Sequence, residues 1–105
     1  MAQYIITYFG EAHFNSKEEG KEHMDKWRAW MGGIMDSVEN PGVPMFKGKV
    51  VKKDSVSDST SADRITGYTV VNANSIDEAV DLVEGCPHLD HGHIEVYEAM
   101  DMPMI

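Results

Sequence analysis

The chain has 105 residues, of which 42% are hydrophobic, and its formal net charge at pH 7 is −9. This length suits one compact domain with one core, and the hydrophobic fraction is typical of a globular chain rather than a disordered one. The excess of 18 acidic over 9 basic residues repels phosphate backbones and anionic lipid, so neither nucleic-acid binding nor membrane binding is expected.

The first predicted element is a strand over residues 3–9, "QYIITYF", which ends at Gly10. Aromatic and β-branched residues favour extended structure. Because side chains alternate along a strand, one face carries Tyr4, Ile6 and Tyr8 and the other carries Ile5, Thr7 and Phe9. Both faces are largely apolar, so this strand needs cover on both sides.

A long helix is predicted next, over residues 17–39. Ser16 and Glu19 have the spacing of a capping box, and "NPG" at residues 40–42 is a stop signal. Apolar residues recur at helical spacing and form one stripe, with His23 at its N-terminal end. The stripe consists of Met24, Trp27, Trp30, Met31, Ile34, Met35 and Val38.

The middle of the chain predicts a weaker edge strand followed by a polar segment. Residues 46–52, "FKGKVVK", have the basic side chains that suit a sheet edge. Residues 53–63 are rich in serine and poor in apolar residues, which predicts a long, mobile hairpin loop.

The last third of the chain predicts strand, helix and strand. Residues 65–73, "ITGYTVVNA", form a central strand, and Ser75 with Glu78 makes a second capping box that opens a short helix. Gly85 and Pro87 end that helix. Residues 93–100 form the final strand, and residues 101–105 form a loose tail.

The predicted order is βαββαβ, a single α+β domain over residues 1–105. In the ferredoxin-like arrangement, two helices cover one face of a four-stranded antiparallel sheet. Two helices leave the other face uncovered, although the first and third strands are apolar on both sides. We therefore expect a homodimer in which a second copy covers that face, over an interface of about 1,600 Å².

Cys86 is the only cysteine, so no disulfide forms within the chain, which favours a reducing compartment. The N-terminus lacks the basic segment and long apolar run of a signal peptide. No apolar stretch approaches the length of about 20 residues that a membrane helix needs. A cytoplasmic protein is expected.

Three segments carry a resemblance to a known family. They are "WRAWMGGIMDSVENPGVP" at residues 27–44, "ITGYTVVNANSIDEAVDLVEGCP" at residues 65–87 and "GHIEVYEAMDM" at residues 92–102. In these segments the chain resembles the YCII-related (YCII-like, DGPF) domain family of the dimeric α/β-barrel superfamily. The resemblance implies ferredoxin-like homodimers with a cleft between the first helix and the segment before the last strand.

The resemblance also implies a candidate acid–base pair. In some members of the family a histidine on the first helix pairs with an aspartate just before a proline, and one relative dechlorinates an aromatic substrate, while most members have no established activity. His23 is the candidate histidine here. The aspartate position holds Cys86, immediately before Pro87, so the pair is incomplete unless Asp90 substitutes.

The stretch "GCPHLDHGHIEVYE" at residues 85–98 allows other chemistry. Its histidines, with Asp90 or Cys86, could bind zinc, but structural zinc sites usually draw ligand pairs from two separate segments, and no second pair exists. No metal or cofactor is therefore expected. Cys86 could be a nucleophile activated by His88, although a buried structural cysteine is the commoner case.

Two classes of function remain open. One is a non-catalytic binding or accessory module with a small-molecule cleft. The other is an enzyme that performs acid–base chemistry of a lyase or dehydrochlorinase type on a small metabolite, aromatic ones included, with His23 as base and Asp90 and His88 assisting. The residues expected to line the cleft are Trp27, Tyr68, Cys86, His91 and His93.

Overall fold

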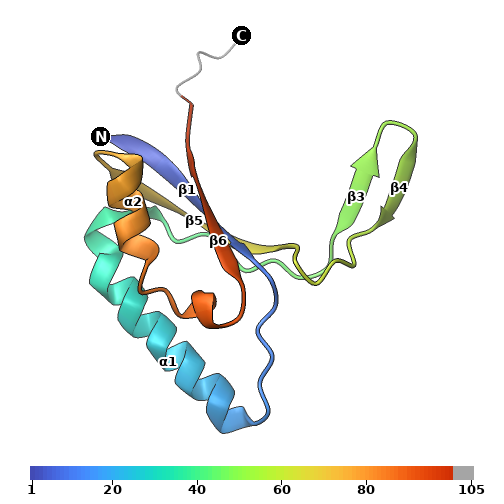
Figure 1. The fold of residues 1–105 in the computed structure, drawn as a ribbon, viewed down its shortest axis with the longest axis horizontal. Helices are drawn as coiled ribbons and strands as arrows, with labels where there is room; N and C mark the ends of the chain where they lie inside the picture. Colours follow the sequence, from blue (N-terminus) through green and yellow to red (C-terminus); the bar gives the residue numbers. More distant parts are fainter. Residues whose placement is uncertain (101–105) are drawn as a thin grey trace.

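A computed structural model describes residues 1–100, and its body is a four-stranded antiparallel sheet with two helices on one face (Figure 1). The sheet order is β2-β5-β1-β6, so the predicted α+β, ferredoxin-like fold is confirmed. The elements are β1 (Ala2–Phe9), α1 (Lys17–Ile34), β2 (Val38–Asn40), β3 (Lys49–Lys52), β4 (Ser55–Asp58), β5 (Ile65–Ala73), α2 (Ile76–Val83) and β6 (His93–Glu98), with short 3₁₀ helices η1 (Met35–Ser37) and η2 (Pro87–Asp90).

Both α-helices begin at the serines that the sequence predicts. The Ser16 hydroxyl oxygen accepts a hydrogen bond from the backbone N–H of Glu19 at 3.1 Å. The Ser75 hydroxyl oxygen accepts one from the backbone N–H of Glu78, also at 3.1 Å. Each bond satisfies a backbone donor that the first helical turn leaves without a partner.

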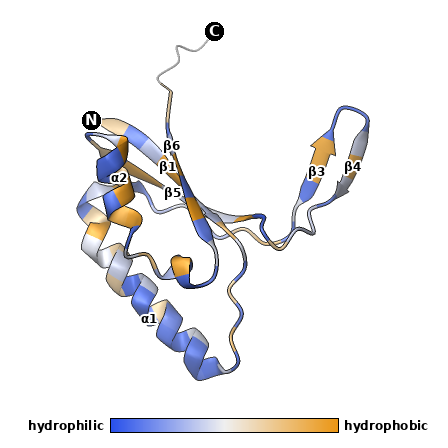
Figure 2. Cartoon of the chain, in the orientation of Figure 1, coloured by the Kyte–Doolittle hydropathy of each residue, from blue (hydrophilic) through white to orange (hydrophobic). Residues whose placement is uncertain are grey.

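The core lies between the sheet and the helices, and the strands fill it by alternation. From β1 it takes Tyr4, Ile6 and Tyr8; the other members are Val71, Ala73, Ala79, Val83 and Cys86. Helix α1 has no fully buried residue, and Figure 2 shows it hydrophilic along much of its length. Its apolar stripe is therefore only partly packed against the core.

The other face of the sheet also carries apolar side chains. Ile5 of β1 pairs with Val70 of β5 and with Tyr97 of β6. Ile5 and Val70 are half-buried, and Tyr97 is exposed. In Figure 1 neither helix lies on this side of the sheet.

The second strand of the sheet is not where the sequence placed it. The predicted helix over 17–39 ends at Ile34, after two glycines that lower helix propensity. Chain segment Val38–Asn40 then pairs with β5, because the residue before Pro41 favours an extended conformation. The prediction that residues 46–52 form this strand was wrong.

Residues 49–58 instead form a separate hairpin, β3–β4, that stands away from the body (Figure 1). Val51 pairs with Val56 across it, and Lys49 bonds to Asp58 at its open end. Part of the segment predicted as a long, mobile hairpin loop over 53–63 is therefore strand β4. The predicted tail, residues 101–105, lies outside the described residues.

Within residues 1–100, no helix has both the length and the apolar character needed to span a membrane.

Candidate functional site

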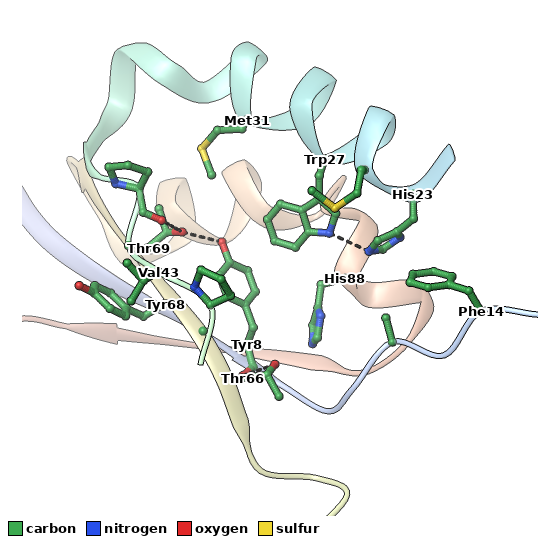
Figure 3. Close-up of a pocket in the computed structure, with 16 residues that line it drawn as sticks. Tyr8, Phe14, His23, Trp27, Met31, Val43, Thr66, Tyr68, Thr69 and His88 are labelled. Atoms are coloured by element: carbon green, nitrogen blue, oxygen red, sulfur yellow. Dashed lines mark hydrogen bonds between the residues drawn. The ribbon is translucent and has the colours of Figure 1, made fainter. Parts of the chain in front are cut away.

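An apolar pocket of about 430 Å³ lies between α1, the sheet and the loop after β2 (Figure 3). Helix α1 provides much of its apolar stripe, and β1, β5 and η2 provide the opposite wall. The side chains labelled in Figure 3 are Tyr8, Phe14, His23, Trp27, Met31, Val43, Thr66, Tyr68, Thr69 and His88, and the lining is completed by Ala12, Met24, Pro41, Gly42, Pro44 and Gly67.

Gly42 allows the loop to lie directly against β5. Its φ is +76°, a left-handed conformation that favours glycine. A Cβ atom at this position would stand 1.7 Å from the carbonyl oxygen of Tyr68. Pro44 then forms a bridge with Gly67 of β5. This close approach fixes one wall of the pocket, and it requires glycine at position 42.

Tyr8 forms the floor of the pocket and belongs to a buried chain of hydroxyl groups. The residue is 5% exposed, and its ring meets that of Trp27 edge to face at 5.2 Å. Its hydroxyl is 2.8 Å from Thr69 Oγ1, which in turn donates to the carbonyl oxygen of Pro41 at 3.0 Å. Burial raises the pKa of Tyr8, so the phenol stays neutral at physiological pH.

His23 shares a hydrogen bond with the next turn of α1. The indole Nε1–H of Trp27 donates to His23 Nε2 at 2.8 Å. An N–H can donate only to a ring nitrogen with a free lone pair, so the neutral His23 ring carries its hydrogen on Nδ1. Partial burial and the neighbouring His91 lower the pKa of His23. In this arrangement His23 offers an N–H donor, while its basic nitrogen is occupied.

His88 is buried, and its position depends on a second glycine. Its Nε2 lies 2.7 Å from the carbonyl oxygen of Phe9. Because a carbonyl oxygen only accepts, Nε2 carries the hydrogen and Nδ1 of the neutral ring is an acceptor. A Cβ atom at Gly92 would stand 2.0 Å from the same Phe9 oxygen and 2.9 Å from His88 Nε2. Gly92 therefore leaves the space that this bond occupies.

The structure brings some of the predicted catalytic residues together and not others. His23 and His88 both line the pocket. Asp90 is exposed and lies on a neighbouring surface groove, near enough to act on the pKa of His23. Among residues 1–100, the hydrogen bond of the His23 side chain is with Trp27 rather than with Asp90. His23 and Asp90 therefore do not form a hydrogen-bonded pair.

Two of the predicted cleft residues, Trp27 and Tyr68, line the pocket. His91 lies just outside, where its ring packs against those of His23 at 4.8 Å and Phe14 at 5.2 Å. His91 thus belongs to an aromatic cluster near the start of α1.

Cys86 and His93 are not among the residues that line the pocket. Cys86 is a buried core residue, and burial raises the pKa of its thiol to about 11, so it is not a thiolate nucleophile near neutral pH. His93 packs on Phe9 at 4.9 Å and reaches the carboxylates of Asp63 and Glu95. Over the part of the chain described, no group of three or more histidine, cysteine, aspartate or glutamate residues is placed to hold a metal ion.

Sequence reasoning missed Tyr8, Thr69 and the loop 41–44 as parts of the site. Side-chain alternation along the strands predicts only that Tyr8 and Thr69 face the helices. That position is the same for an ordinary core residue as for a residue of the pocket. The loop carried one usable signal: a glycine between two prolines in "PGVP", at residues 41–44, is typical of a fixed turn.

Comparisons with known proteins agree with this architecture. The family model described as the YCII-related domain matches residues 1–103. A solved structure of 5-chloro-2-hydroxyhydroquinone dehydrochlorinase (TftG) from Burkholderia phenoliruptrix AC1100, in complex with 2,5-dihydroxybenzoquinone, is similar in fold, with a TM-score of 0.58 and 16% sequence identity over 93% of each chain. A search of curated protein sequences finds no match.

Proposed function

The chain belongs to the YCII-related domain family, and from that premise we propose that it binds a small, flat, mostly apolar molecule in the pocket between α1 and the sheet. The role is that of a non-catalytic binding or accessory module. The pocket itself carries the proposal: its volume of about 430 Å³ falls within the range of small-molecule sites, about 300–1,000 Å³.

The lining favours a planar ligand. The Trp27 ring lines the α1 side of the pocket and meets the Tyr8 ring on the floor, and the Phe14 ring stands towards the start of α1 (Figure 3). Met24 and Met31 bring flexible thioethers that adapt to an aromatic edge. No lysine or arginine lies among the lining residues of the described chain, so the site has no fixed cation to hold a ligand anion.

Three features support binding rather than catalysis. The basic nitrogen of His23 accepts a hydrogen bond from Trp27, and His23 is not hydrogen-bonded to Asp90. The thiol of Cys86 is protonated, and its side chain is a core residue. Proton transfer needs a base within hydrogen-bond reach of the substrate with its lone pair free, and His23 meets this requirement only after releasing Trp27.

We also propose a cytoplasmic homodimer in which the outer faces of the two sheets meet. Ile5, Val70 and Tyr97 lie together on that face, and none of them is fully buried. Apolar side chains from adjacent strands form a contiguous surface that a second copy would cover. The single buried, reduced cysteine suits a reducing compartment.

Native mass spectrometry of gently purified protein tests both proposals. The expected result is a dimer mass with a small adduct on each protomer, and the adduct should disappear when the same sample is denatured. A bare monomer mass would contradict both. A bare dimer that also fails to take up any added single-ring aromatic compound would contradict ligand binding alone.

A second candidate function is acid–base catalysis on an aromatic compound, with His23 as base and Asp90 and His88 assisting. Its support is the pair of histidines in the lining together with the fold similarity to a dehydrochlorinase. Incubation with 5-chloro-2-hydroxyhydroquinone tests it through release of chloride. Release that is abolished in His23→Gln would favour the enzyme, whereas no release from the wild-type protein would exclude this reaction.

A further inference from the structure

Hydroxyl groups in the pocket wall already donate their hydrogens to other groups of the protein. Thr69 Oγ1 donates to the carbonyl oxygen of Pro41 at 3.0 Å, and Thr66 Oγ1 donates to that of Gly10, also at 3.0 Å. A hydroxyl has one hydrogen to donate. Because the Thr69 hydrogen is used, Tyr8 must be the donor in the 2.8 Å bond between the two hydroxyls. All three oxygens are left with acceptor capacity only.

The fourth hydroxyl of the lining, that of Tyr68, is directed elsewhere. Tyr68 stands between Gly67 and Thr69 on β5, and Thr69 faces the helices. Alternation therefore turns the Tyr68 side chain towards the opposite face of the sheet. In Figure 3 its hydroxyl points away from Tyr8 and Trp27.

The ring N–H groups of the lining are committed in the same way, with one exception. The indole hydrogen of Trp27 is given to His23, and the Nε2 hydrogen of His88 is given to the carbonyl of Phe9. The remaining side-chain donor is Nδ1–H of His23, at the end of the pocket near Phe14. Among the side chains, the inner end around Tyr8 presents acceptors alone.

We propose that the inner end of the pocket selects ligands in their neutral, hydroxyl-bearing form, with Tyr8 Oη accepting the ligand's hydrogen bond. This inference rests on the proposed binding function and adds its chemical specificity. A deprotonated ligand oxygen would face the lone pairs of Tyr8 and Thr69 in an apolar site, and it would lose its hydration without gaining a donor. The relay from Tyr8 through Thr69 to Pro41 sets the direction of that bond.

Other titratable groups around Tyr8 set the pH range for a test. His23 and His88 line the pocket, and Cys86 lies close enough to influence Tyr8. Burial raises the pKa values of Tyr8 and Cys86, and the pKa of His23 is lowered. Near neutral pH and moderately above it these three groups are therefore neutral, so their own titration does not change the binding of the probe.

A suitable probe is 4-nitrophenol, which ionises near neutral pH and whose two forms absorb at different wavelengths. Wild-type protein should bind the phenol at least about tenfold more tightly than the phenolate, so the apparent pKa of the bound probe should rise by at least about one unit. The methyl ether 4-nitroanisole, which has no hydrogen to donate, should bind at least about fivefold more weakly than the neutral phenol.

A relay variant sharpens the test. Thr69→Val removes the acceptor of the Tyr8 hydrogen, which is then free to turn towards the ligand, and the preference for the phenol should fall by about tenfold. Thr7→Val is the matched control, because Thr7 is another buried threonine that donates to a backbone carbonyl, at 2.9 Å, on the other face of the sheet. It should keep the wild-type preference. Tyr8→Phe removes the accepting oxygen itself and serves if Thr69→Val fails to fold.

The outcomes separate this inference from the proposed function. If the wild-type protein binds 4-nitrophenol without raising its pKa, or if Thr69→Val and Tyr8→Phe keep the full preference, the inference is overturned while ligand binding stands. If neither 4-nitrophenol nor 4-nitroanisole binds, both the inference and the proposed binding function are contradicted. A raised probe pKa that drops in the Thr69 variant and persists in Thr7→Val supports the relay.

Discussion

Replacing Gly42 by alanine should damage the fold and the pocket together. The added Cβ atom would stand 1.7 Å from the Tyr68 carbonyl oxygen, whereas Cβ atoms essentially never approach other heavy atoms within 3.0 Å. The loop must then move by at least 1.3 Å, the difference between those two distances. The left-handed backbone costs an alanine about 1–2 kcal/mol, and loss of the Gly42 N–H bond to Asn40, 2.8 Å long, costs about 1 kcal/mol more.

The expected result is a free energy of unfolding lower by about 2–3 kcal/mol, measured by urea unfolding followed by tryptophan fluorescence. Gly32→Ala is the matched control. Gly32 lies in α1, and a Cβ atom there meets nothing within 4 Å, so the same change should stabilise the protein by up to about 1 kcal/mol. Affinity for 4-nitrophenol should fall in Gly42→Ala alone. Equal unfolding curves for Gly42→Ala and the wild type would refute the reasoning.

Further predictions concern the titrating and buried side chains. The Cys86 thiol should resist alkylation at pH 8 in the native state and react on unfolding; rapid native labelling would contradict its burial. The indole N–H resonance of Trp27 should titrate with a midpoint below the usual histidine pKa, whereas that of Trp30 should not, because protonated His23 no longer accepts the Trp27 bond. Since the folded-state pKa of His23 is lowered, its contribution to stability is present above about pH 6.5 and is lost as pH falls through the folded pKa, which urea unfolding between pH 5 and pH 8 would measure. His88→Ala should cost about 2–4 kcal/mol in urea unfolding; a loss below about 1 kcal/mol would argue against the buried bond.

Local patterns were enough to predict the elements that fill the core. The strand over 65–73 and the helix opened by Ser75 coincide with β5 and α2, because alternation and a capping serine both act over a few residues. The second strand was missed because β2 has only three residues. Its pairing with β5 depends on where α1 stops, and a long apolar stripe predicts that end poorly.

The candidate site was predictable only where a single residue stands out. His23, Trp27 and His88, which line the pocket, were predicted as site residues because histidine and tryptophan at helical or turn positions stand out by residue type. The hydroxyl relay was not predicted, because it joins Tyr8, Thr69 and Pro41, which are far apart in the sequence. Their contact depends on strand register and on the turn at Gly42. The sequence alone indicated that Cys86 stands at the aspartate position of the acid–base pair that the family resemblance implies. In the structure this cysteine is a buried thiol.

Chemical-shift mapping with 4-nitrophenol tests the central claim, a ligand pocket between α1 and the sheet, most directly. In two-dimensional ¹H–¹⁵N spectra, the Trp27 indole and the Gly42 amide should shift in a saturable way, while the Trp30 indole and the amide of Gly48, at the base of the hairpin, should not. Shifts confined to the hairpin or to the outer face of the sheet, or no saturable shift at all, would contradict it.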